Sequence, residues 1–297
     1  MTKGSYSTVF GQFTNIGLPI DSKLKERYKI KEYVAIGHVN LTYLAENIKS
    51  HERVVIKEFC PYEYSNRDLD GKSVICKGGS FRKDYQVAKQ LFEQECQIHR
   101  KISDYPEKHR KNIVKYLEDF EENHTKYLVL QFIPGLDLYS CMKQKRVIPF
   151  KRIARQIISA VMQIHEMGII HKDLKPSNIV LGDDEKVYII DLGTAELQTD
   201  AENPVKLGSR GFSAPELYQN GVTSVKTDIY SVGAIFYYML VGRLPESGDE
   251  RMLEDTLRPI SNYIHLPLLL EWAIMKCIQV EPKKRWNSLK LLYVLLI

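Results

Sequence analysis

Apolar residues alternate with polar ones in the first part of the chain, and this pattern predicts β-strands. Three such stretches occur within residues 28–58, with a turn at Gly37 between the first two, so we expect an antiparallel meander. Two more strands are predicted at 116–120 and 126–131, and one long helix at 85–102. The N-terminal part is therefore predicted to be β-rich with one prominent helix.

After Pro134 and Gly135 the apolar residues recur at spacings of three and four, which predicts helices. The repeat is clearest in Ile153, Ile157, Ile158, Val161 and Ile164. Further helices are expected at 227–241 and 266–278, and two short strands at 179–181 and 187–190. The change of pattern near residues 133–135 predicts a boundary between two lobes with an active-site cleft between them. The apolar residues that end the chain are interpreted as the buried side of a last helix.

Composition indicates an ordinary globular protein, because 44% of the 297 residues are hydrophobic and 27% are charged. The net charge of +5 is spread along the chain, apart from a basic stretch at residues 99–115. We interpret this stretch as a solvated face, with nucleic-acid binding as the disfavoured alternative, and we expect no nucleic-acid partner.

The five cysteines form no CxxC pair and no metal-ligand spacing, which favours reduced thiols in a cytoplasmic protein. The N-terminus lacks a basic-then-apolar signal pattern, and no apolar run approaches the ~20 residues that span a bilayer. The expectation is a cytoplasmic chain without a membrane segment, disulfide or zinc site.

The strongest chemical signal runs from His171 to Asn178 and is followed by an Asp-x-Gly at Asp191. The eight residues are His-Lys-Asp-Leu-Lys-Pro-Ser-Asn, and in them the chain resembles the protein-kinase family. A loop of ordinary turn-forming residues is the alternative, and eight ordered positions with a correctly placed Asp-x-Gly disfavour it.

This resemblance implies a catalytic role for each matching residue. Asp173 would accept or orient the proton of the substrate hydroxyl, and Lys175 would place its ammonium against the moving phosphoryl group, as in Ser/Thr kinases. Asn178 and Asp191 would supply oxygen ligands to Mg²⁺, with Mn²⁺ as an alternative metal. The implied activity is transfer of the γ-phosphoryl group of ATP to a protein hydroxyl.

Upstream, the run Val54-Val55-Ile56-Lys57 resembles the third-strand lysine motif of the family, in which Lys57 reaches the α- and β-phosphates. Its expected partner is Glu95, because the apolar positions that follow mark the buried helix face beside it, and Glu93 is the reserve candidate. Leu130 would be the gatekeeper residue. By the same resemblance, the nucleotide site comprises Gly37, Val39, Leu44, Val55, Lys57, Gln131, Ile133, Asp137 and Val180.

The likeness covers roughly residues 28–297 and is nearest to bacterial eukaryotic-like Ser/Thr kinases. It implies an α+β, bilobal protein-kinase fold, with a buried ion pair between Glu216 and Arg285, and with Asp228 holding the catalytic-loop backbone. Residues 1–27 would be an N-terminal extension and 28–133 a small β-rich N-lobe with one main helix. Residues 134–297 would form a larger, mostly α-helical C-lobe.

Two departures from the family pattern keep other functions open. Only the first glycine of the glycine-rich loop is kept, with Val39 and Thr42 at the other two glycine positions, and Val55 replaces the usual alanine above the adenine. The alternatives are a nucleotide-binding pseudokinase or regulatory scaffold, and a small-molecule kinase. Every proposed reacting residue is nevertheless present, which favours an active protein kinase.

Residues 60–83 and Lys172 bear on regulation. The first is rich in turn residues, with one hairpin at most, and is interpreted as an insertion: a surface excursion is favoured, and docking of a regulatory partner is the alternative. Lys172 stands where many family members carry an arginine that receives an activation-segment phosphate, and lysine is the weaker phosphate clamp. The activation segment, residues 191–216, contains Thr194, Thr199, Ser209 and Ser213, whose hydroxyls could be phosphorylated. We expect activity not to depend on their phosphorylation.

Overall fold

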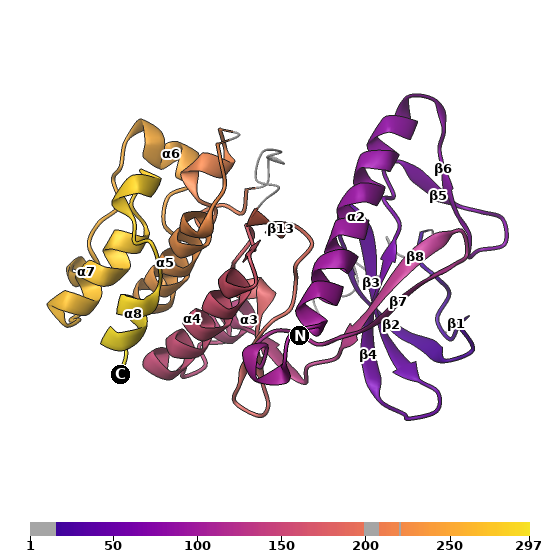
Figure 1. The fold of residues 1–297 in the computed structure, drawn as a ribbon, viewed down its shortest axis with the longest axis horizontal. Coiled ribbons are helices and arrows are strands. Elements are labelled where there is room, and N and C mark those ends of the chain that lie inside the picture. The colour runs from indigo at the N-terminus through magenta and orange to yellow at the C-terminus, as the bar shows by residue number, and fades with distance from the viewer. Residues whose placement is uncertain (1–15, 199–207, 220) are drawn as a thin grey trace. The chain divides into compact units, whose positions relative to one another are not determined.

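The computed structural model describes residues 16–198, 208–219 and 221–297. The chain divides into two compact units (Figure 1). Unit 1 takes in the described residues of Met1–Ser103 and Val114–Phe132, and unit 2 takes in those of Asp104–Ile113 and Ile133–Ile297. Thr199, a candidate phosphorylation position, lies outside the described residues.

Unit 1 is built on a six-stranded antiparallel sheet in the order β1-β2-β3-β4-β8-β7. The strands are β1 (Lys23–Leu24), β2 (Tyr28–Ile36), β3 (Asn40–Asn47), β4 (Arg53–Phe59), β7 (Tyr116–Glu122) and β8 (Thr125–Gln131). The predicted meander is therefore confirmed. Between β7 and β8 the chain turns at Asn123 and His124, whose φ angles of 52° and 55° lie in the left-handed region that asparagine tolerates.

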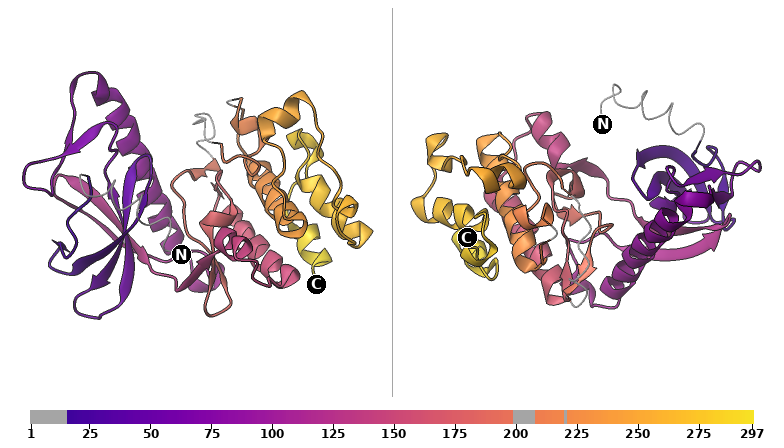
Figure 2. Two further views of the ribbon diagram at one scale, coloured as in Figure 1. Left: turned by 180° about the vertical axis from the view of Figure 1, so that it is seen from behind. Right: turned by 90° about the horizontal axis from the view of Figure 1, so that it is seen from above.

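The pleat of β4 sends alternate side chains to opposite faces of the sheet, which fixes where its charged residues lie. On one face, Val54 and Ile56 join the hydrophobic core of unit 1, and Glu58 follows them at the same period. On the other face, Phe59 packs on Phe92 of α2 (Arg82–Ser103), with ring centroids 5.7 Å apart. Lys57 therefore faces the helix, and the rear view in Figure 2 shows α2 lying along the sheet.

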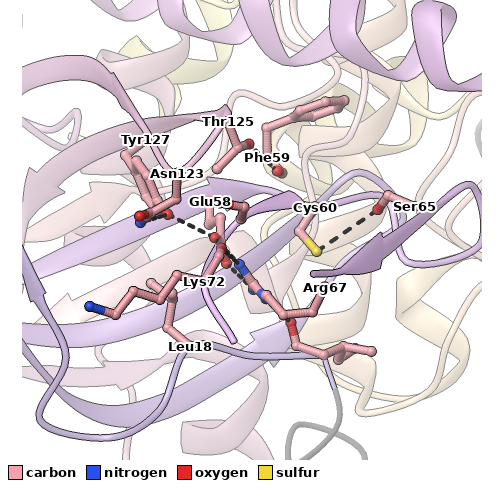
Figure 3. A network of polar contacts seen from close by, with 12 residues as sticks. Leu18, Glu58, Phe59, Cys60, Ser65, Arg67, Lys72, Asn123, Thr125 and Tyr127 are labelled. Atoms are coloured by element: carbon pink, nitrogen blue, oxygen red, sulfur yellow. Dashed lines mark hydrogen bonds and ion pairs between the residues drawn. The ribbon is translucent and has the colours of Figure 1, made fainter. Parts of the chain in front are cut away.

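The insertion forms a hairpin that belongs to the core of unit 1. Its strands are β5 (Ser65–Arg67) and β6 (Val74–Cys76), and Val74 is buried in the same core cluster. Arg67 donates to both oxygens of Glu58, at 2.7 Å each, and Glu58 has 0% exposure (Figure 3). The hydroxyls of Tyr43 and Tyr127 donate to the same carboxylate, at 2.6 and 2.9 Å.

The interpretation of this stretch as a surface excursion is therefore wrong, because its arginine neutralises a buried charge of the sheet. The same guanidinium donates to the carbonyl oxygen of Ile16, at 2.6 and 3.0 Å, so the segment before β1 is anchored there too. Docking of a regulatory partner to the hairpin stays a prediction.

Unit 2 is mostly helical, and its short strands lie in the first part of the unit, between residues 135 and 197. Its helices are α3 (Leu138–Lys143), α4 (Phe150–Glu166), α5 (Val225–Val241), α6 (Gly248–Leu253), α7 (Leu268–Cys277) and α8 (Lys290–Leu295). A three-stranded sheet joins β12 (Val187–Ile189), β11 (Ile179–Gly182) and β9 (Gly135–Asp137), and β10 (Ile169–Ile170) pairs with β13 (Glu196–Leu197). Its short 3-10 helices include η2 (Glu107–His109), η3 (Pro176–Asn178), η5 (Pro215–Leu217), η6 (Ile260–Asn262) and η7 (Pro282–Lys284), whereas η1 (Gly79–Phe81) precedes α2 in unit 1.

Local sequence signals explain the two long helices of unit 2. The periodic isoleucines of α4, among them Ile153 and Ile164, are fully buried, as the spacing predicted. Helix α5 begins with a capping box between Ser224 and Thr227 and ends at Gly242, whose φ of 73° is the left-handed conformation typical of a helix end. At Gly233 an added Cβ would lie 2.6 Å from atoms of α7, so α5 and α7 pack closely there.

All five cysteines are free thiols, and Cys76 is the one that is not fully buried. Burial raises the pKa of the Cys60 and Cys96 thiols to about 12. Within the described residues, no helix is long and apolar enough to cross a membrane.

Candidate active site

The loop from His171 to Asn178 is held in unit 2 by Asp228, a fully buried residue of α5. Its two carboxylate oxygens accept the backbone N–H groups of His171, at 2.8 Å, and Lys172, at 2.9 Å, and His165 Nε2 lies 2.8 Å away. Burial alone would raise the pKa of Asp228, but the hydrogen bond from His165 and the nearby His171 hold it below its usual value. The expected role of Asp228 in holding this loop is confirmed.

Asp173 is the centre of a polar cluster that draws on two segments of unit 2. Lys175 Nζ lies 2.6 Å from its Oδ2, and Ser209 Oγ donates to its Oδ1 at 2.7 Å. Lys175 Nζ also donates to Ser209 Oγ at 3.1 Å, so the three side chains form a closed triangle. The carboxylate is therefore oriented by the ammonium of Lys175, the hydroxyl of Ser209 and, at 3.3 Å, the side-chain amide of Asn178.

Ser209 is a site residue that sequence reasoning missed, since it was considered only as a phosphorylation position. Its backbone N–H donates to Ser213 Oγ at 2.7 Å, and Ser213 is buried just ahead of Ala214-Pro215-Glu216. The one available signal was its place in the segment that ends at that motif. Its contact with Asp173 spans 36 residues and depends on the fold.

Asn178 and Asp191 present oxygen atoms suited to a divalent metal. Asn178 Nδ2 donates to the backbone oxygen of Asp173 at 2.9 Å, an arrangement that turns the amide oxygen away from the loop backbone. Asp191 Oδ1 accepts the N–H of Gly193 at 3.0 Å. One carboxylate and one amide oxygen fit Mg²⁺, which binds few protein ligands and takes phosphate oxygens and water for the rest.

A second group of predicted residues lies in unit 1. Lys57 Nζ is 2.5 Å from Glu95 Oε1, with exposures of 7% and 1%, whereas Glu93 forms an ion pair with Lys126. Leu44 is the cross-strand neighbour of Val55, and Thr42 is that of Lys57, so these side chains share one face of the sheet. The structure thus brings Lys57, Glu95, Leu44 and Val55 together.

Gly37 and Val39 lie in the tight turn between β2 and β3. The N–H of Gly37 donates to the backbone oxygen of Asn40 at 2.8 Å, and an added Cβ at Gly37 would lie 3.2 Å from Asn40 Oδ1. The backbone oxygen of Val39 accepts the N–H of Cys60 at 3.1 Å. The turn is therefore closed by its own hydrogen bonds even though only one glycine remains.

The remaining nucleotide-site candidates follow the end of β8. Gln131 is the last residue of that strand, its N–H donates to the backbone oxygen of Lys115 at 2.9 Å, and Ile133 follows two residues later. Asp137 caps α3 by accepting the N–H and hydroxyl of Ser140, at 2.8 and 2.6 Å, and it is the cross-strand partner of Val180. Asp137 is thus held by the helix that it caps.

Two further ion pairs brace unit 2. Arg285 donates to both oxygens of Glu216, at 2.8 Å each, which confirms the expected buried pair. Lys172 Nζ lies 2.6 Å from Glu196 Oε2, with exposures of 5% and 3%, and Thr223 donates its hydroxyl to the other oxygen of Glu196. The cation that precedes Asp173 is therefore already neutralised by the chain itself.

Comparisons with known proteins agree with these motifs. Residues 28–293 match the family described as protein kinase domain. A probable serine/threonine-protein kinase of Clostridium acetobutylicum is 26% identical over 283 residues, covering 91% of this chain and 39% of that protein. Serine/threonine-protein kinase D of Synechocystis is 28% identical over 284 residues, covering 90% and 51%. The chain thus spans about half or less of the length of these relatives.

One solved structure, the apo form of PpkA-294, shares the fold of this chain. Its TM-score is 0.80 at 24% sequence identity, and the match covers 95% of this chain and 99% of the other. The likeness takes in both the curled antiparallel sheet with its helix and the helical part.

Proposed function

Because the chain belongs to the protein kinase domain family and has its fold, we propose that it is a Ser/Thr protein kinase. The reaction would move the γ-phosphoryl group of ATP to a protein hydroxyl, with Mg²⁺ as cofactor and Mn²⁺ as an alternative metal. The observation that carries the proposal is the cluster of Asp173, Lys175 and Ser209, in which the carboxyl group of Asp173 and the amino group of Lys175 are held side by side.

Asp173 would orient the substrate hydroxyl and accept its proton as the new P–O bond forms, while the bond from the γ-phosphorus to the bridging oxygen breaks and ADP leaves with that electron pair. The contact with Lys175 fixes the orientation of the carboxylate, and the same ammonium can offset negative charge on the transferring phosphoryl group. Phosphoryl transfer needs little covalent help from protein groups, so positioning and charge compensation account for most of the expected catalysis. Asp173 would position the substrate hydroxyl, and Lys175 would compensate the charge of the phosphoryl group.

Each unit offers residues suited to a nucleotide or its metal. Lys57, oriented by Glu95, would bind the α- and β-phosphates, and Asn178 and Asp191 would hold the metal, which neutralises phosphate charge when bound. The backbone of Gln131 and Ile133 would receive the adenine edge. The reduced thiols favour a cytoplasmic location for this reaction.

The competing function is a nucleotide-binding pseudokinase or scaffold, which is favoured by Val39 in the β2–β3 turn and Thr42 in β3, at positions where the family pattern has glycines. The deciding variant is Asp173→Asn, which keeps the shape of the side chain and removes its basic carboxylate. We expect transfer to a generic protein substrate to fall at least ~10²-fold, the effect of losing a positioned base, while ATP binding by calorimetry stays unchanged.

Asp183→Asn is the matched control, because Asp183 is an exposed carboxylate of the turn between β11 and β12. Its transfer rate should equal that of the unaltered protein. Near-normal turnover in Asp173→Asn would refute the catalytic assignment. Nucleotide binding without any transfer by the unaltered protein would establish the scaffold instead, and labelled metabolites with unlabelled protein would indicate a small-molecule kinase.

A further inference from the structure

Unit 2 contains a groove of about 440 Å³ that is lined by residues of α4 and of the end of the chain at α8. Figure 1 shows the positions of these two helices within unit 2. Its cations are Lys151, Arg152 and Arg155, from the first two turns of α4, and its apolar wall includes Tyr293 and Leu296. We call it the α4–α8 groove. None of its lining residues belongs to the proposed catalytic or nucleotide-binding set.

The charges of the groove are not balanced by the fold. Arg152 pairs with Glu185 at 2.6 Å, an exposed contact on the β11–β12 turn. The guanidinium of Arg155 lies over the ring of Tyr293, 5.4 Å from its centroid. Within the described residues, no carboxylate pairs with Lys151 or Arg155. Two positive charges of the groove are therefore left uncompensated.

Stability of the helix does not explain these cations. The first turn of α4 carries no acidic residue, and cations near a helix N-terminus oppose the helix dipole. The cluster therefore costs the fold some stability, which favours a role in recognition.

A second basic element leads into the same groove. Asn112, which lines it, donates its side-chain amide to the backbone oxygen of Val187 at 2.8 Å. The residues just before it are Lys108, Arg110 and Lys111, part of the basic stretch that sequence reasoning treated as a solvated face. Of that stretch, the fold places Asn112 in the lining of the groove.

We propose that the α4–α8 groove binds an acidic peptide segment of a partner protein. Carboxylates of the segment would face Lys151, Arg152 and Arg155, and an apolar side chain would pack on Tyr293 and on Ile297, an exposed residue that also lines the groove. The volume lies within the range of ~300–1,000 Å³ typical of ligand sites, which is more space than a single anion needs. Arginine and tyrosine together are typical of protein interfaces. The inference stands whether or not the chain transfers phosphate.

The test measures binding of a fluorescein-labelled peptide of glutamate and leucine to the full chain by fluorescence anisotropy. A peptide of lysine and leucine with the same length and pattern is the comparison probe. We expect the acidic peptide to bind at least ~10-fold more tightly, about 1.4 kcal/mol, and to weaken as salt is raised.

The variant Lys151→Glu/Arg152→Glu reverses two exposed charges and should weaken the acidic peptide at least ~10-fold. Its matched control, Lys283→Glu/Lys284→Glu, makes the same change of net charge at another exposed site of unit 2 and should bind normally. The milder Arg155→Gln, with a thermal melt, serves if the first variant folds poorly, and it should also weaken binding.

Equal binding of both peptides, or equal losses in the groove variant and its control, would overturn the proposal. So would a single-stranded oligonucleotide that binds more tightly than the acidic peptide and loses affinity in the same variant, because it would make the groove a nucleic-acid site. Transfer to a generic protein substrate, measured in parallel, should be unchanged in the groove variant. A loss of peptide binding is thereby told apart from a failure of the proposed catalysis.

Discussion

Replacing Arg67 by methionine should strongly destabilise the protein, because the carboxylate of Glu58 would stay buried without its cation. Glu58 has 0% exposure, and it loses two hydrogen bonds of 2.7 Å in this variant (Figure 3). Breaking a buried ion pair by removing one partner costs about 3 to 5 kcal/mol. The two tyrosine hydroxyls that donate to Glu58 remain, and they offset only part of the loss. We therefore expect the free energy of unfolding to fall by about 3 kcal/mol or more.

The assay is urea denaturation followed by tryptophan fluorescence and circular dichroism. Arg82→Met, which removes an exposed arginine at the start of α2, is the matched control and should change stability by less than ~0.5 kcal/mol. The double variant Arg67→Met/Glu58→Gln removes the buried charge as well and should be more stable than Arg67→Met alone. A loss below ~1 kcal/mol, or a double variant no more stable than the single one, would refute the reasoning.

The other predictions concern the chemistry and control of unit 2. Asp191→Ala should abolish the effect of Mg²⁺ on ATP binding measured by calorimetry, and an unchanged metal effect would place the ligand elsewhere. Phosphatase-treated protein should keep its transfer rate within ~10-fold, about 1.4 kcal/mol of barrier, because Glu196 already neutralises Lys172; a larger drop that autophosphorylation restores would contradict this. Ser209→Ala should lower kcat ~10-fold or more by removing a hydrogen bond to the carboxylate of Asp173, the proposed catalytic base, while Ser209→Thr retains it; equal kcat values in steady-state assays would argue against that contact. Burial lowers the pKa of His171 against the opposing pull of three aspartates, so the unfolded chain takes up the proton first and stability should fall as pH drops below about 6.5. Urea unfolding at several pH values tests this, and an equally steep fall in His171→Asn would contradict it.

Periodicity and short motifs predicted much of this fold because both are local. The buried isoleucines of α4 follow a helical spacing, and the strands from β2 to β4 follow alternation, so each could be located without knowledge of its partners. The loop at His171 was recognisable because its chemistry depends on residues that are adjacent in sequence. Glu95 was favoured over Glu93 on the pattern of the helix, and the structure places it against Lys57.

Contacts between distant segments left no such pattern. The hairpin of β5 and β6 was missed as core structure because its sequence is polar and rich in turn residues. Its buried valine, Val74, does not belong to an alternating or helical pattern of apolar residues. Arg67 and Glu58 are separated by a stretch whose sequence predicts a loop. Ser209 was mistaken for a regulatory hydroxyl alone, because only the folded chain brings it to Asp173. Strands of two residues, such as β10 and β13, are also too short to be predicted by alternation.

Because four of the five thiols are buried, the remaining cysteine is suited to selective labelling with a spectroscopic probe. Four cysteines are buried, and a raised pKa leaves little of the reactive thiolate at neutral pH, as at Cys60 and Cys96. Cys76 is partly open to solvent and stands on β6, beside the strand that carries Arg67. A maleimide dye should therefore attach there in preference to the other four positions. The unaltered chain can thus be labelled on its hairpin, and opening of the buried ion pair can be followed by the fluorescence of the attached dye.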